Sequence, residues 1–247
     1  MCEKLLKKSK KIDFGFKKIK INHKKELVNQ VFNQVSPKYN LMNDLASLGM
    51  HRLWKNELIN WLAPQPHQTL ADLAGGTGDV AKKFVQNGGK NADIIDININ
   101  MVKNGLSLKV GKIRHIIGNC EKLPIKDNSY HRATIAFGLR NITYREKALK
   151  EIYRILKPGG RFVCLEFSKI ENDFLKKLYD LWSFNFLPSL GAIIANNRDA
   201  YQYLVESIRM FPNQDELALM MTKANFSRVK YKNLSEGIVA LHSGWKI

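Results

Sequence analysis

The sequence has no long apolar run and few cysteines, and each absence excludes a class of protein. No stretch of about 18 apolar residues occurs in the 247 residues, so we expect no membrane-spanning helix. The basic N-terminal segment lacks an apolar stretch long enough for a secretory signal. Cys2, Cys120 and Cys164 form no CxxC pair, which favours a reduced cytosol. The six histidines show no ligand spacing, so no metal site is indicated.

Acidic residues are scarce relative to basic ones. The formal net charge is +18, and residues 1–25 hold ten lysines but only two acids. One interpretation is a surface that binds nucleic acid or anionic lipid. The other is a solvated tail in a chain that is rich in lysine and asparagine throughout, and we favour it for most of the charge. Weak attraction to a negative membrane follows in either case.

The first quarter of the chain lacks the pattern of the rest. Residues 1–25 are expected to form a disordered basic tail, and residues 26–66 a helical cap with amphipathic helices before Pro37 and over RLWKNELINWLA. The remaining segment, residues 67–247, is expected to form the main domain.

From residue 69 onward, strand-like and helix-like segments alternate. This rhythm predicts a parallel sheet with helices on both faces. Two final strand-like segments have only a short connection and must therefore be antiparallel. A mostly parallel sheet of seven strands that closes with an antiparallel hairpin is the Rossmann-like α/β fold of class I methyltransferases. The expected strands are TLADLA, ADIIDI, IRHIIGN, HRATIAFGL, RFVCLEFSK, FSRVKYKNL and GIVALHSGWKI, with a tight turn at KPGG before the fifth.

Residues 171–212 do not read as a crossover between strands. The segment is helical in pattern and unusually aromatic, and it includes Tyr201. We expect it to form a helical lid.

The glycine turn of residues 69–84, TLADLAGGTGDVAKKF, indicates a nucleotide-like ligand. Gly76, Thr77 and Gly78 with Ala81 match the dinucleotide pattern G-x-G-x-x-A, which is weak evidence by itself. Asp72 at the strand end and Asp79 at the helix start would repel a pyrophosphate but attract an amine.

S-adenosylmethionine, which carries a sulfonium and an ammonium group, therefore fits this turn better than NAD. Asp96 ends the next strand, where a carboxylate can accept both ribose hydroxyls of either cofactor or can cap a helix.

A series of motifs resembles one family closely. KYNLMND, GMHRLWK, DLAGGTGD, GNCEKLP, FGLRN, LKPGGR with LEFS, ESIRMFPNQ and NLSEGIVALHSGWK occur in one order between about residue 14 and the end. Together they resemble the ubiquinone/menaquinone biosynthesis C-methyltransferases of the UbiE type. GMHRLWK, FGLRN and RMFPNQ in series are far more specific than DLAGGTGD alone.

The resemblance implies a site for S-adenosylmethionine. It assigns Thr77 to the turn, Asp96 to the ribose, and Asn119 and Cys120 to the adenine. Cys120 is interpreted as a small neighbour of the ring rather than a nucleophile. Departures from the family pattern are Ala136, where relatives often carry a serine that touches the cofactor, and also Tyr130–His131 and Asn40.

The resemblance also implies methylation of a ring carbon of a polyprenylated quinol, either a benzoquinol or demethylmenaquinol. We hypothesise that Arg140 stabilises the negative charge that develops on a quinol oxygen, and that Asn141 orients that group. Arginine is a poor base, so a water, Asp79 or Tyr39 would take the proton. The alternative is that Arg140 pairs with an acid and Asn141 caps a helix.

Further residues are expected to line the substrate wall. These are Asn43, His51, Trp54 and Tyr201. A bilayer-resident substrate implies a cytoplasmic enzyme that visits the inner face of the membrane. A quinone-biosynthesis complex and a homodimer are left open, and no nucleic-acid partner is expected.

Three other functions compete with this interpretation. An RNA methyltransferase suits the charge, but FGLRN replaces the Asn/Asp-Pro-Pro-aromatic site used on base nitrogens. A non-catalytic scaffold of a quinone-synthesis assembly would bind the cofactor structurally. A dehydrogenase would bind NADH through the same glycine turn.

Overall fold

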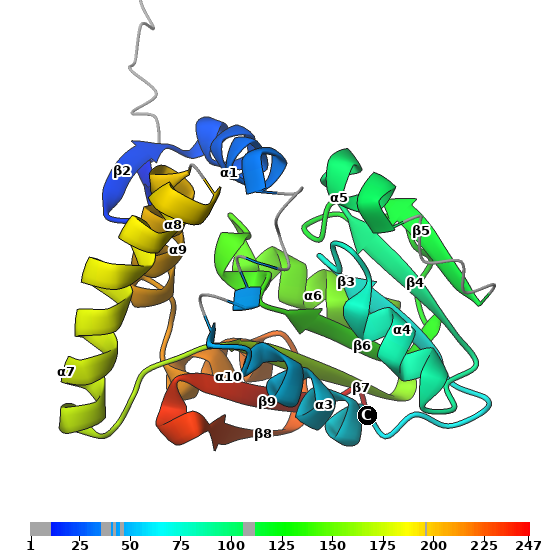
Figure 1. The fold of residues 1–247 in the computed structure, drawn as a ribbon. Coiled ribbons are helices and arrows are strands. Elements are labelled where there is room, and N and C mark those ends of the chain that lie inside the picture. Colours follow the sequence, from blue (N-terminus) through cyan, green and yellow to red (C-terminus); the bar gives the residue numbers. More distant parts are fainter. Residues whose placement is uncertain (1–10, 36–40, 42, 45–46, 106–111, 196) are drawn as a thin grey trace, which may run out of the picture.

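The computed structural model describes residues 11–35, 41, 43–44, 47–105, 112–195 and 197–247. At its centre lies a seven-stranded sheet in the order β5-β4-β3-β6-β7-β9-β8 (Figure 1). The strands are β3 (Thr69–Leu73), β4 (Asn91–Asp96), β5 (Ile113–Ile117), β6 (Tyr130–Ala136), β7 (Leu156–Phe167), β8 (Ser227–Leu234) and β9 (Val239–Trp245).

The direction of the strands confirms the predicted fold class. β5, β4, β3, β6 and β7 run parallel, and β9 pairs antiparallel with both β7 and β8. The short 3-10 turn Ser235–Gly237 joins β8 to β9, as a tight hairpin requires. The chain leaves β3 toward β4 on one side and returns through β6 on the other. This reversal opens a crevice at the carboxyl ends of β3 and β6.

Helices cover both faces of the sheet and bury it in two apolar layers. One layer includes Leu58, Leu62 and Phe84 from α3 (His51–Leu62) and α4 (Asp79–Gln86). The other includes residues of α6 (Arg145–Ile155) and α10 (Gln214–Lys223). The short α5 (Ile99–Gly105) follows β4. Because both faces are covered, the central strands carry buried apolar residues on both faces, as Leu70, Ala71 and Leu73 of β3 show.

The KPGG segment differs from the tight turn that the sequence predicts. It is part of β7, which pairs with β6 at Leu156 and again at Arg161, with a register shift between the two pairs. Gly159 adopts φ +76, and its N–H donates to the Lys246 carbonyl at 2.7 Å. The glycines therefore form a bulge that keeps the strand continuous.

The prediction of a disordered tail over residues 1–25 is wrong for its described part. β1 (Lys11–Phe14) and β2 (Lys17–Lys20) form an antiparallel hairpin, and α1 (Ile21–Val35) follows at once. Gly15 supplies the positive φ of the turn, +59°. The ring of Phe14 stacks on Tyr203 at 4.3 Å between centroids, so tertiary packing holds a segment whose lysine content resembles a solvated tail.

The helical lid lies beside this hairpin (Figure 1). The lid, defined as residues 171–212, consists of α7 (Asp173–Leu181), the π-helical turn Trp182–Phe186, α8 (Leu187–Ala195) and α9 (Arg198–Arg209). α3 lies in the segment expected to form the helical cap, residues 26–66, whereas α1 begins at Ile21, inside the expected tail, and continues into that segment. In the part of the chain described here, we find no helix of the length and apolarity needed to cross a membrane.

Candidate functional site

A pocket of about 800 Å³, including its open mouth, lies at the carboxyl ends of the parallel strands. Its walls come from α1, from the loops after β3, β4 and β5, and from the segment after β6. The lining residues are Lys25, Val28, Asn29, Phe32, Ala74, Gly76, Asp96, Ile97, Asn98, Met101, Gly118, Asn119, Cys120, Glu121, Phe137, Gly138, Asn141, Ile142 and Thr143.

Asp96 fixes the entrance to this pocket from the end of β4. Its Oδ2 accepts the N–H of Gly76 at 2.9 Å, and its Oδ1 accepts the N–H of Asn98 at 2.8 Å. Burial raises the pKa of the Asp96 carboxyl, while these N–H donors oppose the rise. The carboxylate thus joins the glycine turn to the end of the neighbouring strand and still borders the pocket.

The glycine turn depends on close backbone approach. Gly76 and Gly78 adopt φ values of +56° and +84°, which favour glycine. A Cβ on Gly75 would lie 2.8 Å from the Cγ of Asp72. Burial raises the pKa of Asp72 to about 7 although its Oδ2 accepts the Ala81 N–H at 3.1 Å. Its Oδ1 is buried and has no partner among the described residues, so it can accept a hydrogen bond from a ligand.

A smaller pocket adjoins the first and contains Asp72, Thr77, Asp79 and Ala136 together with Lys55. The Nζ of Lys55 lies 2.9 Å from the Oδ2 of Asp79. Burial favours the protonated form of Asp79, but the Lys55 cation outweighs it and lowers the pKa of the carboxyl. A carboxyl with a lowered pKa is a weak base, which argues against Asp79 as the proton acceptor.

The sequence analysis did not identify Lys55. Its only signal was a lysine on the inward face of the amphipathic helix RLWKNELINWLA, which ordinarily indicates snorkelling to solvent.

The other end of the main pocket is formed by Asn119 and Cys120. The Oδ1 of Asn119 accepts the Glu121 N–H at 3.0 Å and shapes the loop after β5. Burial raises the pKa of the Cys120 thiol to about 12, so the group is a neutral, small wall residue. This environment agrees with an unreactive cysteine.

Arg140 lies in the 3-10 turn Leu139–Asn141 after β6 and forms a buried ion pair. Its Nη1 is 2.9 Å from the Oε1 of Glu166 and also donates to the Phe137 carbonyl. The Oε2 of Glu166 accepts the Arg140 backbone N–H at 3.2 Å. Glu166 therefore neutralises much of the positive charge on Arg140, a partner that the motif LEFS alone did not suggest.

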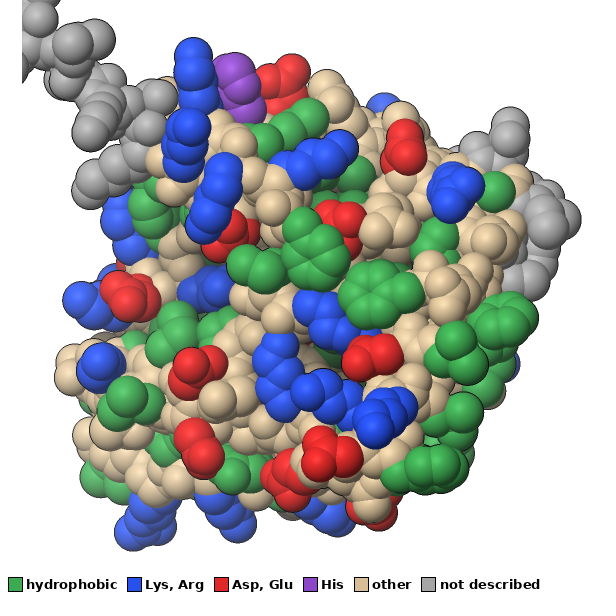
Figure 2. All heavy atoms as spheres, turned by 90° about the vertical axis from the view of Figure 1, so that its left-hand side faces the viewer, with side chains coloured by type: hydrophobic (Ala, Val, Ile, Leu, Met, Phe, Trp, Pro, Cys, Tyr) green, Lys and Arg blue, Asp and Glu red, His purple; other side chains and the backbone are tan. Residues whose placement is uncertain are grey.

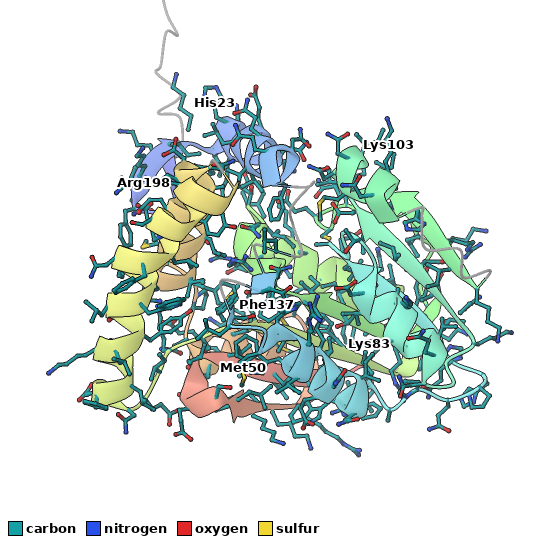
Figure 3. All side chains as sticks on the ribbon, in the orientation of Figure 1. His23, Met50, Lys83, Lys103, Phe137 and Arg198 are labelled. Carbon is teal, nitrogen blue, oxygen red and sulfur yellow. The ribbon has the colours of Figure 1, made fainter. Side chains whose placement is uncertain are left out.

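Asn141 points its side chain at the pocket wall. Its Oδ1 accepts the hydroxyl of Tyr203 at 3.0 Å, which fixes the amide orientation. Its Nδ2 is buried without a partner among the described residues. Phe137, labelled at the centre of Figure 3, and Ala74 have φ values of +58° and +49°. Such backbone strain at two strand ends is typical of a functional site.

The four residues expected on the substrate wall lie in two different environments. Trp54 is buried against Phe137 and Phe167, with its Nε1 donating to Ser235 at 2.9 Å. Tyr201 is fully buried in the same apolar layer. Both therefore act as core residues rather than as exposed contacts. Their burial follows from their places on the inward faces of α3 and α9.

His51 and Asn43 lie near the start of α3. His51 Nε2 is 2.8 Å from Asp44 Oδ1, and burial lowers the pKa of the imidazole despite that contact. The Asn43 carbonyl accepts the Ser47 hydroxyl at 2.6 Å. Neither residue lines the two pockets described above. Tyr39 and Asn40 lie outside the described residues, as does Pro37.

α1 covers the mouth of the main pocket, a feature that the sequence analysis missed. Lys25 pairs with Glu121 at 2.7 Å. The Nδ2 of Asn98 donates to Asn29 and Asn33 at 2.8 and 2.9 Å. These contacts join the helix to the loops after β4 and β5. The unusual density of asparagines was the only sequence signal for this network.

Comparison with known proteins gives the same assignment from sequence and fold. Residues 18–246 match the model of the ubiE/COQ5 methyltransferase family. "Ubiquinone/menaquinone biosynthesis C-methyltransferase UbiE" of Brucella abortus (strain S19) is 50% identical over 243 residues, covering 95% of this chain and 90% of its own. The protein of the same name from Bartonella bacilliformis is 50% identical over 249 residues, covering 95% and 94%.

Solved structures share the fold at low sequence identity. An S-adenosylmethionine-dependent methyltransferase of Thermotoga maritima is 22% identical with a TM-score of 0.64 and covers 89% of this chain and 100% of its own. A methyltransferase solved with the Trm112 activator of Haloferax volcanii is 15% identical with a TM-score of 0.66, covering 89% and 97%. The chain thus belongs to the ubiE/COQ5 methyltransferase family, and its methyl donor is S-adenosylmethionine.

The raised pKa of Asp72 generates a test of cofactor binding. Only the ionised carboxylate attracts the ammonium group of S-adenosylmethionine, so affinity should increase as pH rises through about 7. Asp72→Asn should remove this increase and bind several-fold more weakly at pH 8. Titration calorimetry from pH 6 to 8 measures both effects, with the exposed Asp173→Asn as control. An unchanged pH dependence in Asp72→Asn would show that another group titrates.

Proposed function

We propose that this enzyme transfers the methyl group of S-adenosylmethionine to a ring carbon of a polyprenylated quinol in ubiquinone or menaquinone biosynthesis. The observation that carries the proposal is the far wall of the main pocket, beyond the cofactor loops. There the apolar side chains of Phe137 and Ile142 adjoin the Nδ2 of Asn141, which has no partner among the described residues. An apolar slot with a few fixed donors suits an aromatic ring that bears hydroxyl groups.

The chemistry requires two things of such a pocket. A ring carbon becomes nucleophilic only when a neighbouring hydroxyl is ionised, so donors must stabilise the oxygen as its charge develops. The carbon must also lie in line with the methyl group and the sulfur. The loops from β3, β4 and β5 would hold the cofactor, and the segment after β6 would hold the ring. Both sets meet where the strand order reverses.

Arg140 and Asn141 are proposed to support the developing charge. Glu166 anchors Arg140 and bridges the backbone N–H groups of Arg140 and Phe167, so the pair also fixes the turn that presents Asn141. Both side chains of the ion pair are buried. Removing one of them would therefore leave the other as an unpaired buried charge, at a large cost in free energy of folding.

This arrangement can be tested with a pair of substitutions. Arg140→Met alone should lower turnover by orders of magnitude and destabilise the fold by about 3–5 kcal/mol, because Glu166 is left as a buried unpaired charge. Arg140→Met combined with Glu166→Met should recover most of the stability but not the turnover. Thermal unfolding and single-turnover methyl transfer separate the two effects. Recovery of turnover in the double variant would reduce Arg140 to a purely structural role.

The reaction itself is tested by mass spectrometry of membrane quinones. A bacterium that lacks its own quinol C-methyltransferase should regain the methylated benzoquinone or menaquinone when this gene is supplied. The pool that gains one methyl group identifies the ring. An active-site variant such as Asp72→Asn, expressed to the same level, serves as control. If neither pool changes while the purified protein binds S-adenosylmethionine, the substrate assignment fails and an RNA or scaffold function has to be considered.

We further propose that the enzyme visits the membrane through its lid. Phe174, Leu178 and Leu181 repeat at helical spacing on α7 and are 74%, 56% and 53% exposed. Phe186 lies five residues after Leu181, one π-helical turn further, and is also half exposed. We call these four residues the apolar ridge.

Lysines flank this ridge. Lys176 and Lys177 are exposed on α7 itself. The hairpin beside the lid carries exposed Lys17 and Lys18 next to Phe16, whose ring lies 6.2 Å from that of Phe184. Figure 2 shows this side of the molecule, where hydrophobic side chains lie among lysines, arginines and several acidic side chains. Exposed apolar side chains with lysines beside them suit the interface of an anionic bilayer.

Vesicle binding tests the membrane proposal. Replacing Phe174, Leu178 and Leu181 by serine should reduce co-sedimentation with anionic vesicles several-fold and slow methylation of a vesicle-embedded quinol. Methylation of a short-tailed, water-soluble quinol should not change, because the replaced side chains are exposed. Leu219→Ser on α10, which is 53% exposed in the wild type, is the matched control. Wild-type vesicle binding by the triple variant would contradict the proposal.

A further inference from the structure

Two cations lie beside the substrate end of the pocket without acidic partners of their own. Lys24 is only 3% exposed as a residue and forms no ion pair among the described residues, although its Nζ is not one of the fully buried atoms without a partner. The Nε of Arg145 is buried and likewise unpartnered, although one Nη donates to the Arg140 carbonyl at 3.1 Å. Burying a cation without a partner costs several kcal/mol. A compensating ligand would explain why the fold tolerates it.

The acids nearest to these cations are already paired. Asp13 lies 2.6 Å from Lys18 at the surface of the hairpin. Glu121 lies 2.7 Å from Lys25 and accepts the Tyr144 N–H at 3.1 Å. Glu166 is occupied by Arg140. Three cations, Lys24, Arg140 and Arg145, therefore lie near two buried carboxylates, Glu166 and Glu121, and because Glu121 is also paired with Lys25, the region carries an excess of positive charge.

Neither Lys24 nor Arg145 is itself a lining residue of the pocket, but helix geometry places each of them next to residues that are. Lys24 and Val28 are four residues apart on α1 and share one face, and Val28 lines the pocket. Arg145 begins α6, two residues after Thr143, which also lines the pocket. The Thr143 hydroxyl is a third buried group with no partner among the described residues. The Arg145 guanidinium lies over the Phe211 ring at 5.1 Å, which fixes its plane.

We propose that Lys24 and Arg145, with the Thr143 hydroxyl and the Asn141 amide, form a subsite that binds a negatively charged oxygen of the substrate. Resting on the proposed function, this oxygen is the ionised ring hydroxyl of the quinol. The four groups supply hydrogen-bond donors and two uncompensated positive charges, whereas Arg140 is largely neutralised by Glu166. The subsite would favour the phenolate and thereby activate the adjacent ring carbon.

The environment of Lys24 supports this role. Burial, and then the charge of Arg145, lower the pKa of Lys24 to about 8, while Asp13 and Glu121 oppose the change. Near neutral pH the Lys24 ammonium thus stays charged, although burial and the Arg145 charge both disfavour that form. A phenolate beside it would offset that cost, and binding of the anion and protonation of Lys24 would reinforce each other.

A chromophoric phenol tests the subsite without methyl transfer. The probe is 4-nitro-1-naphthol, whose rings match a naphthoquinol and whose phenolate absorbs visible light. Bound to the wild-type enzyme saturated with S-adenosylhomocysteine, it should ionise about one pH unit lower than in water. Lys24→Met and Arg145→Gln should abolish most of this shift, and Lys24→Arg should retain it. Lys20→Met, which removes an exposed lysine of β2, is the control.

The outcomes separate this inference from the proposed function. Failure of the wild type to bind the probe, an unshifted pKa of the bound probe, or an equal shift in Lys24→Met would overturn the subsite, whatever the quinone pools show. Loss of the shift in Lys24→Arg as well as in Lys24→Met would also overturn it, since charge alone would not be sufficient. Circular dichroism melting confirms that each variant is folded.

Steady-state kinetics add a second readout. With a short-tailed quinol, the rising limb of kcat against pH, which reports ionisation in the enzyme–substrate complex, should move to higher pH in Lys24→Met but not in Lys20→Met. A lower rate with an unmoved limb would indicate a structural effect and contradict the proposal. If the probe ionises as expected but no quinol is methylated, the subsite stands and the quinol assignment fails.

Discussion

The parallel pairing of β3 with β4 on one side and β6 on the other is the constraint on which the site depends. Parallel strands place their carboxyl ends at one edge, and the reversal of strand order at β3 and β6 sends the two connections that follow to opposite sides of the sheet. The backbone turns sharply directly after each of these two strands, with positive φ values at Ala74 and Phe137. Gly138 allows the loops to cross closely, because a Cβ there would lie 2.8 Å from that of Ala74. Cofactor and acceptor can meet only because this edge is open.

The two sides of this edge carry opposite charges, which suits a cofactor on one side and an acceptor on the other. On the β3 side, the acids Asp72 and Asp96 are buried, and burial raises the pKa of each. On the β6 side, Arg140 and Arg145 contribute cations. A cationic methyl donor and an acceptor that becomes anionic would each meet the opposite charge. Low local dielectric strengthens both attractions and makes each unpaired group costly before ligands bind.

The sequence predicted the fold well because the relevant signals are local. Apolar runs such as ADIIDI, the glycine turn, and the short link before GIVALHSGW each encode one element and its direction. The positions of Asp96, Asn119 and Cys120 at strand ends also followed from the order of elements. Glu166 as the partner of Arg140 did not follow, since 26 residues separate them and the pairing depends on how β6 and β7 align. Trp54 and Tyr201 were assigned to the substrate by their chemistry, whereas packing buries them.

The N-terminal segment shows why composition misled. The lysines of its described part, residues 11–25, are mostly solvent-exposed, as a tail would have them, yet Ile12 pairs with Ile19, and Phe14 stacks on Tyr203 of the lid. Tyr203 in turn donates to Asn141 at the pocket wall. One chain of contacts therefore runs from the hairpin through the lid to the proposed acceptor site. A sequence window over residues 11–25 contains none of these partners, so its charge outweighs its few apolar residues.

The same hairpin leads into α1, which brings Lys24 inward and places Lys25 at the pocket mouth. The segment that resembled a dispensable tail thus helps to enclose the main pocket.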